Sequence, residues 1–115
     1  MRYMALIYNE ESPEPEPMTP EGMAPWIKFG EEATARGANP VGEALQPTAT
    51  ATTVRLRNGQ VLTTDGPFAE TKEVLGGYYI LDCADLDTAI ELAAKIPAAE
   101  YGSIEVRPIL EIPDA

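Results

Sequence analysis

The sequence predicts an α+β domain with a ferredoxin-like antiparallel sheet, two helices on one face and an inserted β-hairpin. Strand-like and helix-like segments follow each other in the order β-α-β, hairpin, β-α-β, which is typical of that fold. The Asn58-Gly59 pair stands between two strand-like segments, and this pair is the strongest short hairpin signal. The 115 residues are enough for one domain with a real core, so residues 1–115 are expected to form a single domain.

The chain opens with a predicted strand and a predicted loop. Residues 2–8 carry apolar side chains on both faces, so this strand should be covered on both sides of the sheet. Residues 9–20 alternate prolines with acids, which favours an extended, solvated loop. A lid or a partner-binding segment is the alternative interpretation of this loop.

A helix is expected next, over residues 19–36. Thr19 can act as its N-cap, and Gly37 is a suitable stop. Pro25 disturbs the pattern, because an interior proline removes a hydrogen bond and clashes with the preceding turn. The regular helix could therefore start only near Ala24, after an irregular turn.

The middle of the chain predicts a strand and then the hairpin. Residues 39–47 alternate so that Glu43 shares a face with two apolar residues. In the hairpin, the two-residue Asn58-Gly59 loop fixes the register of the flanking strands. The expected pairs are Arg57 with Gln60, Leu56 with Val61, Val54 with Thr63, and Thr52 with Asp65.

Two strands and a helix complete the predicted fold. Residues 76–83 form a strand that is apolar on both faces, and Asp85 caps the helix that follows and ends at Pro97. In the last strand, residues 103–112, Pro108 lacks a backbone donor and indicates a gap in the ladder or an edge position.

The sheet has one face that this fold leaves without cover. Both helices lie on the same face, yet the first strand and residues 76–83 are apolar on both. A second copy of the chain is the natural cover, so we expect a homodimer with the two sheets face to face.

Composition excludes several classes of function. The net charge of −11 opposes binding to nucleic acids and to anionic membranes, and no run approaches the ~20 apolar residues of a membrane span. Histidine is absent, which removes histidine-based catalysis and zinc sites built on imidazole. No metal or cofactor is expected. The lone Cys83 and the lack of a signal-peptide pattern predict a cytoplasmic protein, in which Cys83 is a small buried hydrophobe.

Four blocks of sequence carry a resemblance to a known family. They are RYMALIY near the start, GEALQPTATATTVR, TDGPFAETKEVLGGYYILD, and IEVRP near the end. On these blocks the chain resembles the YCII-related, or DGPF-domain, family of small bacterial proteins. The resemblance implies a dimeric α/β barrel and supplies no settled activity. It also implies a link to extracytoplasmic-function sigma factors, beside whose genes this family often lies. Some wider relatives use a His–Asp pair, which this chain cannot form.

The DGPF stretch holds the main candidate for chemistry, Asp65. As a turn, it uses Gly66 and Pro67 to redirect the chain and Phe68 to anchor the loop in the core. As a site, it would place Asp65 at the mouth of a cavity between helix and sheet, where desolvation suits a carboxylate to act as a general base.

The other candidates are polar or aromatic residues that could line a small-molecule pocket beside this turn. Each also has a structural interpretation: surface ion pairs for the charged residues, and packing for the tyrosine. An arginine in such a site could hold a carboxylate ligand. The candidate ligand-binding residues are Glu43, Phe68, Glu70, Lys72, Tyr78 and Arg107.

Three hypotheses about function follow. The first is a homodimer that binds a small molecule near the DGPF turn. The second is an acid–base enzyme of the lyase or isomerase type, with Asp65 as the base. The third is a non-catalytic regulator of a sigma-factor pathway.

Overall fold

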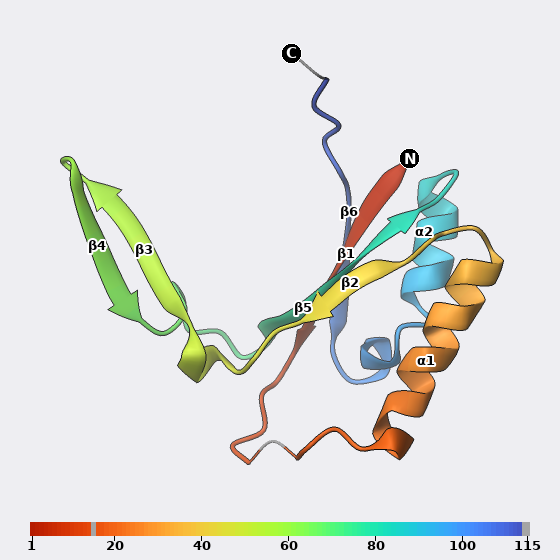
Figure 1. The fold of residues 1–115 in the computed structure, drawn as a ribbon, viewed down its shortest axis with the longest axis horizontal. Helices are drawn as coiled ribbons and strands as arrows, with labels where there is room; N and C mark the ends of the chain where they lie inside the picture. The colour runs from red at the N-terminus through yellow and green to blue at the C-terminus, as the bar shows by residue number, and fades with distance from the viewer. Residues whose placement is uncertain (15, 114–115) are drawn as a thin grey trace.

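The computed structural model describes residues 1–14 and 16–113, and within them one four-stranded sheet and one separate hairpin. The strands of the sheet lie in the order β2-β5-β1-β6, all neighbours antiparallel, and both helices cover the same face (Figure 1). The ferredoxin-like prediction is confirmed. The elements are β1 (Arg2–Asn9), α1 (Pro20–Ala35), β2 (Val41–Ala44), β3 (Thr52–Arg57), β4 (Gln60–Asp65), β5 (Val74–Asp82), α2 (Leu86–Ala93) and β6 (Ser103–Pro108), with short 3-10 turns at Thr48–Thr50 and Pro97–Glu100.

The core lies between the sheet and the two helices. Tyr3, Ala5 and Ile7 of the central strand β1 point into it, and Phe29 of α1 and Leu92 of α2 pack from the helix side. Among the described residues every fully buried side chain is apolar or tyrosine, so hydrophobic burial is what holds the helices to the sheet. Cys83 is buried in this core, as expected.

Helix α1 begins at its predicted cap in spite of its proline. The Thr19 hydroxyl accepts a hydrogen bond from the backbone N–H of Gly22 at 3.0 Å, and the helix is continuous from Pro20. The expectation of a start near Ala24 is therefore wrong. Pro25 is exposed, so water can hydrate the carbonyl that its missing N–H leaves without a donor.

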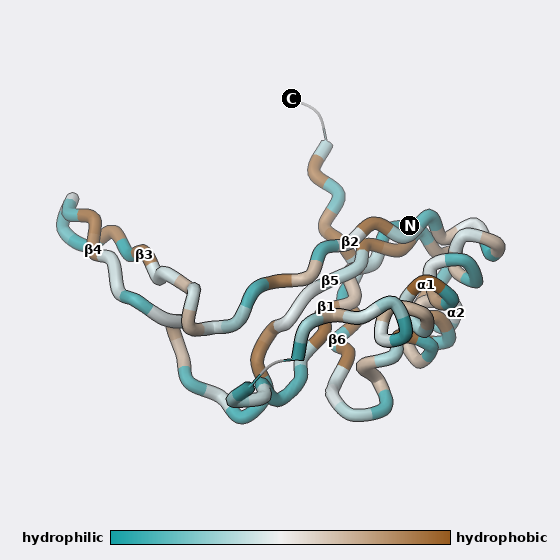
Figure 2. Tube along the Cα trace, turned by 60° about the horizontal axis from the view of Figure 1, so that its bottom comes forward, coloured by the Kyte–Doolittle hydropathy of each residue, from teal (hydrophilic) through white to brown (hydrophobic). Residues whose placement is uncertain are grey.

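The hairpin has the predicted register, pair for pair, from Arg57–Gln60 to Thr52–Asp65. Asn58 and Gly59 both have positive φ, 51° and 77°, as a tight two-residue loop requires. The hairpin does not return to the sheet. It stands away from it on the side opposite the helices (Figure 1), and hydrophobic residues recur along its length (Figure 2).

The projecting hairpin makes the molecule larger than a compact chain of its length. The radius of gyration is 16.4 Å, whereas a compact 115-residue domain is expected near 13 Å. Val54, Leu56 and Val61 on one hairpin face are 63–68% exposed. The single chain therefore leaves apolar surface on the hairpin without cover.

The DGPF turn is held by its backbone and by Thr53. The N–H of Gly66 donates to the carbonyl of Ala51 at 2.7 Å, and the Thr53 hydroxyl donates to the carbonyl of Gly66 at 2.9 Å. Phe68 is 80% exposed. The prediction that Phe68 anchors this loop in the core is wrong, because none of the described helices and strands covers the Phe68 side chain.

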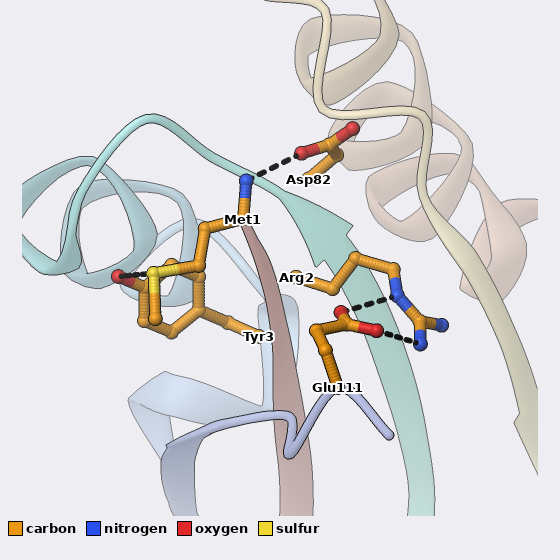
Figure 3. A network of polar contacts seen from close by, with 5 residues as sticks. All are labelled: Met1, Arg2, Tyr3, Asp82 and Glu111. Carbon is orange, nitrogen blue, oxygen red and sulfur yellow. Dashed lines mark hydrogen bonds and ion pairs between the residues drawn. The ribbon is translucent and has the colours of Figure 1, made fainter. Parts of the chain in front are cut away.

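Polar contacts tie the N-terminus and the segment after β6 to the sheet (Figure 3). The N-terminal ammonium of Met1 pairs with Asp82 at 3.1 Å, and the Arg2 guanidinium donates two hydrogen bonds to Glu111 at 2.9 and 3.0 Å. This bidentate pair raises the pKa of Arg2 and lowers the pKa of Glu111, since each charge stabilises the other. The segment after β6 is therefore fixed beside β1.

The face of the sheet opposite the helices, here called the open face, is apolar and uncovered. By strand register it presents Met4, Leu6 and Tyr8 of β1 and Tyr78 and Ile80 of β5, all half-buried. The four strands close no barrel within the chain. Strand β6 is an edge and ends at Pro108, as its missing donor predicts.

The two phenylalanines of the chain give a direct test of where the core lies. Phe29→Ala, at a side chain only 2% exposed, should lower the free energy of unfolding by about 3–5 kcal/mol. Phe68→Ala should change it by less than about 0.5 kcal/mol, as an exposed site does. Urea denaturation at low protein concentration measures both. Equal losses in the two variants would contradict the placement of the Phe68 loop outside the core.

Candidate functional site

The helix–sheet cavity is the hollow enclosed between the start of α1 and the β2–β5 side of the sheet. Its volume is about 280 Å³, close to the lower bound for small-molecule pockets. Most of its wall is aromatic, methionine or glycine. The lining residues are Ile7, Asn9, Met18, Met23, Trp26, Gly42, Glu43, Ala44, Gly76, Gly77, Tyr78, Tyr79, Ala98 and Tyr101.

Glycines on β2 and β5 bring the two strands close together at the wall of this cavity. A Cβ at Gly42 would clash with the carbonyl oxygen of Tyr78 and come within 2.7 Å of the Tyr79 ring. A Cβ at Gly77 would come within 2.8 Å of the Glu43 carbonyl oxygen. Only glycine allows β2 and β5 to approach this closely at the wall of the cavity.

Tyr79 is the centre of an aromatic group at the wall of the cavity. Its ring lies 4.9 Å from the ring of Phe29 and 6.5 Å from the ring of Trp26, measured between centroids. Such offset contacts contribute beyond the area that they bury. Burial raises the pKa of the Tyr79 hydroxyl, because the phenolate is poorly solvated there.

The DGPF hollow is a second concavity, beside the turn after β4. It has a volume of about 450 Å³, and its wall includes Pro67, Phe68 and Ala69 of the turn together with Tyr8 and Leu75 of the open face. The remaining lining residues are Leu45, Gln46, Pro47, Thr48, Thr50, Ala51, Thr71 and Val74. It is no more open to solvent than the helix–sheet cavity.

Three of the predicted site residues lie on the open face. Glu43 and Tyr78 are direct cross-strand partners on β2 and β5, and Arg107 lies on β6 at the opposite edge. Arg107 pairs with Glu105 at 3.1 Å and not with Glu43, from which two strands separate it. Glu43 and Tyr78 also border the helix–sheet cavity, although the register directs their side chains to the other face.

The remaining predicted residues surround the base of the hairpin and do not converge. Phe68 lines the DGPF hollow, and Glu70 is exposed in the loop that follows. Lys72 forms a surface ion pair with Glu10 at 3.4 Å. Asp65 is exposed at the end of β4 and lines neither the helix–sheet cavity nor the DGPF hollow.

The described part of the chain holds no cluster of acids and cysteine that could bind a metal ion, and none of its helices is long and apolar enough to cross a membrane. Cys83 is buried, and its burial raises the pKa of the thiol. A protonated, buried thiol is a poor nucleophile.

Sequence reasoning missed the cavity residues Trp26, Tyr79 and Tyr101. A usable signal was present in the Gly76-Gly77 pair, since adjacent glycines inside a strand mark a close approach or a space for a ligand. The only tryptophan of the chain, three residues after Met23 on the predicted helix, was a second signal.

The fold and cavity define a small α+β domain of the ferredoxin-like class with a pocket between helix and sheet. Residues 1–113 match the family model of the YCII-related domain. A protein of Rhizobium meliloti (strain 1021), described as uncharacterized, is 41% identical in an alignment 123 residues long, and the alignment covers 95% of this chain and 92% of that protein. The chain therefore belongs to the YCII-related domain family.

The raised pKa of Tyr79 predicts how stability depends on pH. A group whose pKa is higher in the folded state than in the unfolded state contributes stability below its unfolded pKa, about 10 for tyrosine. That contribution is lost as the pH rises above 10. Tyr79→Phe should therefore reduce the alkaline fall of the urea midpoint, whereas Tyr101→Phe, at an exposed ring, should leave it as in the wild type. An unchanged alkaline fall in Tyr79→Phe would show that the ring is hydrated.

Proposed function

We propose that the chain is a homodimeric protein that binds a small, largely apolar molecule in the helix–sheet cavity. The single observation that carries the proposal is the composition of the cavity wall. Trp26, Tyr79 and Tyr101 supply aromatic surface, Met18 and Met23 supply adaptable apolar surface, and Asn9 supplies a side-chain amide. A flat, neutral, aromatic molecule fits this wall best.

The helix–sheet cavity is a better binding site than the DGPF hollow. Trp26 and Tyr79 in its wall pack against the buried core, so this part of the wall is already shaped in the free protein and gains little order on binding. Met18 and Tyr101 complete the wall with exposed side chains. The DGPF hollow is lined instead by side chains such as Phe68 and Leu45 that are largely exposed in the single chain. Exposed apolar side chains of this kind fit a protein partner better than a small ligand.

Binding is favoured over acid–base catalysis. Glu43 is the only carboxylate residue in the lining of the helix–sheet cavity, and the strand register turns it toward the open face. A general base must come within hydrogen-bonding reach of its substrate. With Glu43 turned away, the cavity wall supplies hydrogen-bonding and aromatic groups and no carboxylate base.

The homodimer is supported by the open face. Five half-buried apolar side chains there, with the exposed Val41 beside them, form one contiguous surface on β1, β5 and β2. Apolar patches of this kind mark interaction sites, and isologous pairing of two copies is the commonest way to cover them. The single, buried cysteine suits the reducing cytoplasm of a bacterium.

Ligand binding can be measured by the fluorescence of Trp26, which is the only tryptophan of the sequence and lies in the cavity wall. Neutral aromatic fragments of the size of phenol and naphthalene should change its fluorescence with saturation. Ala44→Leu adds side-chain volume on the cavity side of β2 and should weaken binding at least tenfold. Ala49→Leu, at an exposed residue outside the cavity, is the matched control and should bind as the wild type does. Equal binding by both variants would place the ligand elsewhere.

Asp65 offers a second test, because it separates cavity binding from a reaction at the DGPF turn. Asp65→Asn removes the charge without changing the shape of the side chain. Since Asp65 lines neither hollow, the affinity of the fragments for the variant should stay within twofold of the wild type. A tenfold or greater loss of fragment affinity would show that Asp65 belongs to the binding site.

A further inference from the structure

We infer that the β3–β4 hairpin is an exchanged arm, which docks on the open face of the sheet in a second copy of the chain. The inference rests on the proposed homodimer and goes beyond it by naming the two surfaces that meet. The docking face of the arm is the face that carries Val54, Leu56 and Val61. Each copy would contribute one arm and one open face, so both surfaces of both copies are covered.

The hairpin needs a partner to be stable. An isolated two-stranded hairpin is at best marginally stable in water and requires packing against further structure. Here β3 and β4 form a sheet of their own, and the largest apolar side chains on both of their faces are exposed. The hairpin also stands away from the sheet of its own chain, at the far end of the connection after β2 (Figure 1).

The two surfaces match in length and chemistry. Six-residue strands such as β3 and β4 are about 20 Å long. The open face runs along β1 and β5, whose strands of 8 and 9 residues are somewhat longer. Both surfaces carry paired apolar side chains, Leu56 with Val61 toward the tip of the arm and Leu6 with Tyr78 near the middle of the sheet.

Charge selects the arm as the element that can approach another copy. The whole chain carries −11, yet residues 52–65 hold two arginines and one aspartate and are therefore net positive. Arg55 and Arg57 make no ion pair with any described residue of their own chain. A positive arm lowers the repulsion between two acidic copies and steers their encounter.

The arrangement of charge on the hairpin also selects the face that docks. Arg55 and Arg57 project from the face opposite Val54 and Leu56, so docking through the apolar face leaves both guanidinium groups at the rim. There they can reach acidic side chains at the margin of the other copy's sheet and stay hydrated. Asp65, at the base of the docking face, comes to lie at the interface.

Cross-linking between copies tests the arrangement. In a Cys83→Ala background, Leu56→Cys on the arm is mixed with Leu6→Cys on the open face and treated with a short bis-maleimide. We expect a covalent dimer that contains one chain of each variant. The matched control mixes Leu56→Cys with Ile27→Cys, an exposed position on α1 behind the sheet, and should yield at most a tenth of that product. The contrary result is a cross-link between two Leu6→Cys chains and none between Leu6→Cys and Leu56→Cys. It would overturn the docking of the arm and show that the two sheets meet directly.

A second variant separates failure of the arm from failure of the dimer. Replacement of residues 52–65 by a short Gly-Ser linker should give a monomer in light scattering that keeps the Trp26 fluorescence of the folded core. If the shortened chain is still a dimer, the homodimer is supported and the docking of the hairpin on the second copy is ruled out. A wild-type chain that is monomeric at high concentration would overturn both. Fragment binding to Trp26 is measured on the same samples and reports on the cavity independently.

Reversal of one rim charge gives a quantitative check. Arg57→Glu should raise the dissociation constant of the dimer roughly two- to fivefold, and the effect should shrink at high salt. Lys28→Glu makes the same change of charge on α1, on the helix side of the sheet, and should alter dissociation less than Arg57→Glu does. An equal response of the two variants would show that only total charge matters, and it would count against the arm.

Discussion

The structure depends on a mismatch between the number of apolar surfaces and the number of layers in one chain. Strands β1 and β5 are apolar on both faces, but α1 and α2 cover only one of them. Each large apolar side chain contributes about 1.5–3 kcal/mol when it is fully buried. The half-buried side chains on the open face are therefore less stabilised than the core, because no described element of the chain covers them.

The fold was predictable because its signals are local. Alternation along the strands and the Asn58-Gly59 turn determine the hairpin register residue by residue, and Thr19 and Asp85 cap the helices as their side chains predict. The errors came where tertiary context decides. Pro25 is tolerated because it faces water, and Phe68 is exposed because whether a loop residue is buried depends on segments distant in sequence.

The site was less predictable than the fold, for the same reason. Sequence reasoning followed charged and polar residues, and the structure distributes these over the open face, the hairpin base and the surface. The helix–sheet cavity is built instead largely from aromatic and small residues of α1, β2 and β5, and such residues in a sequence pattern predict only a core. No local rule states which core residues leave a space between them.

The wall of the cavity depends on the way β2 joins the sheet. Gly42 and Gly77 lack side chains because backbone atoms of the neighbouring strand occupy the positions where a Cβ would lie. Glycine inside a strand is a conformational cost, so the close approach of β2 to β5 must be stabilised by its neighbours. Tyr79, packed against Phe29 across the core, does this by lying over Gly42. The same ring that holds the edge strand in place therefore forms the wall of the cavity, and the site and the edge of the sheet are one structural unit.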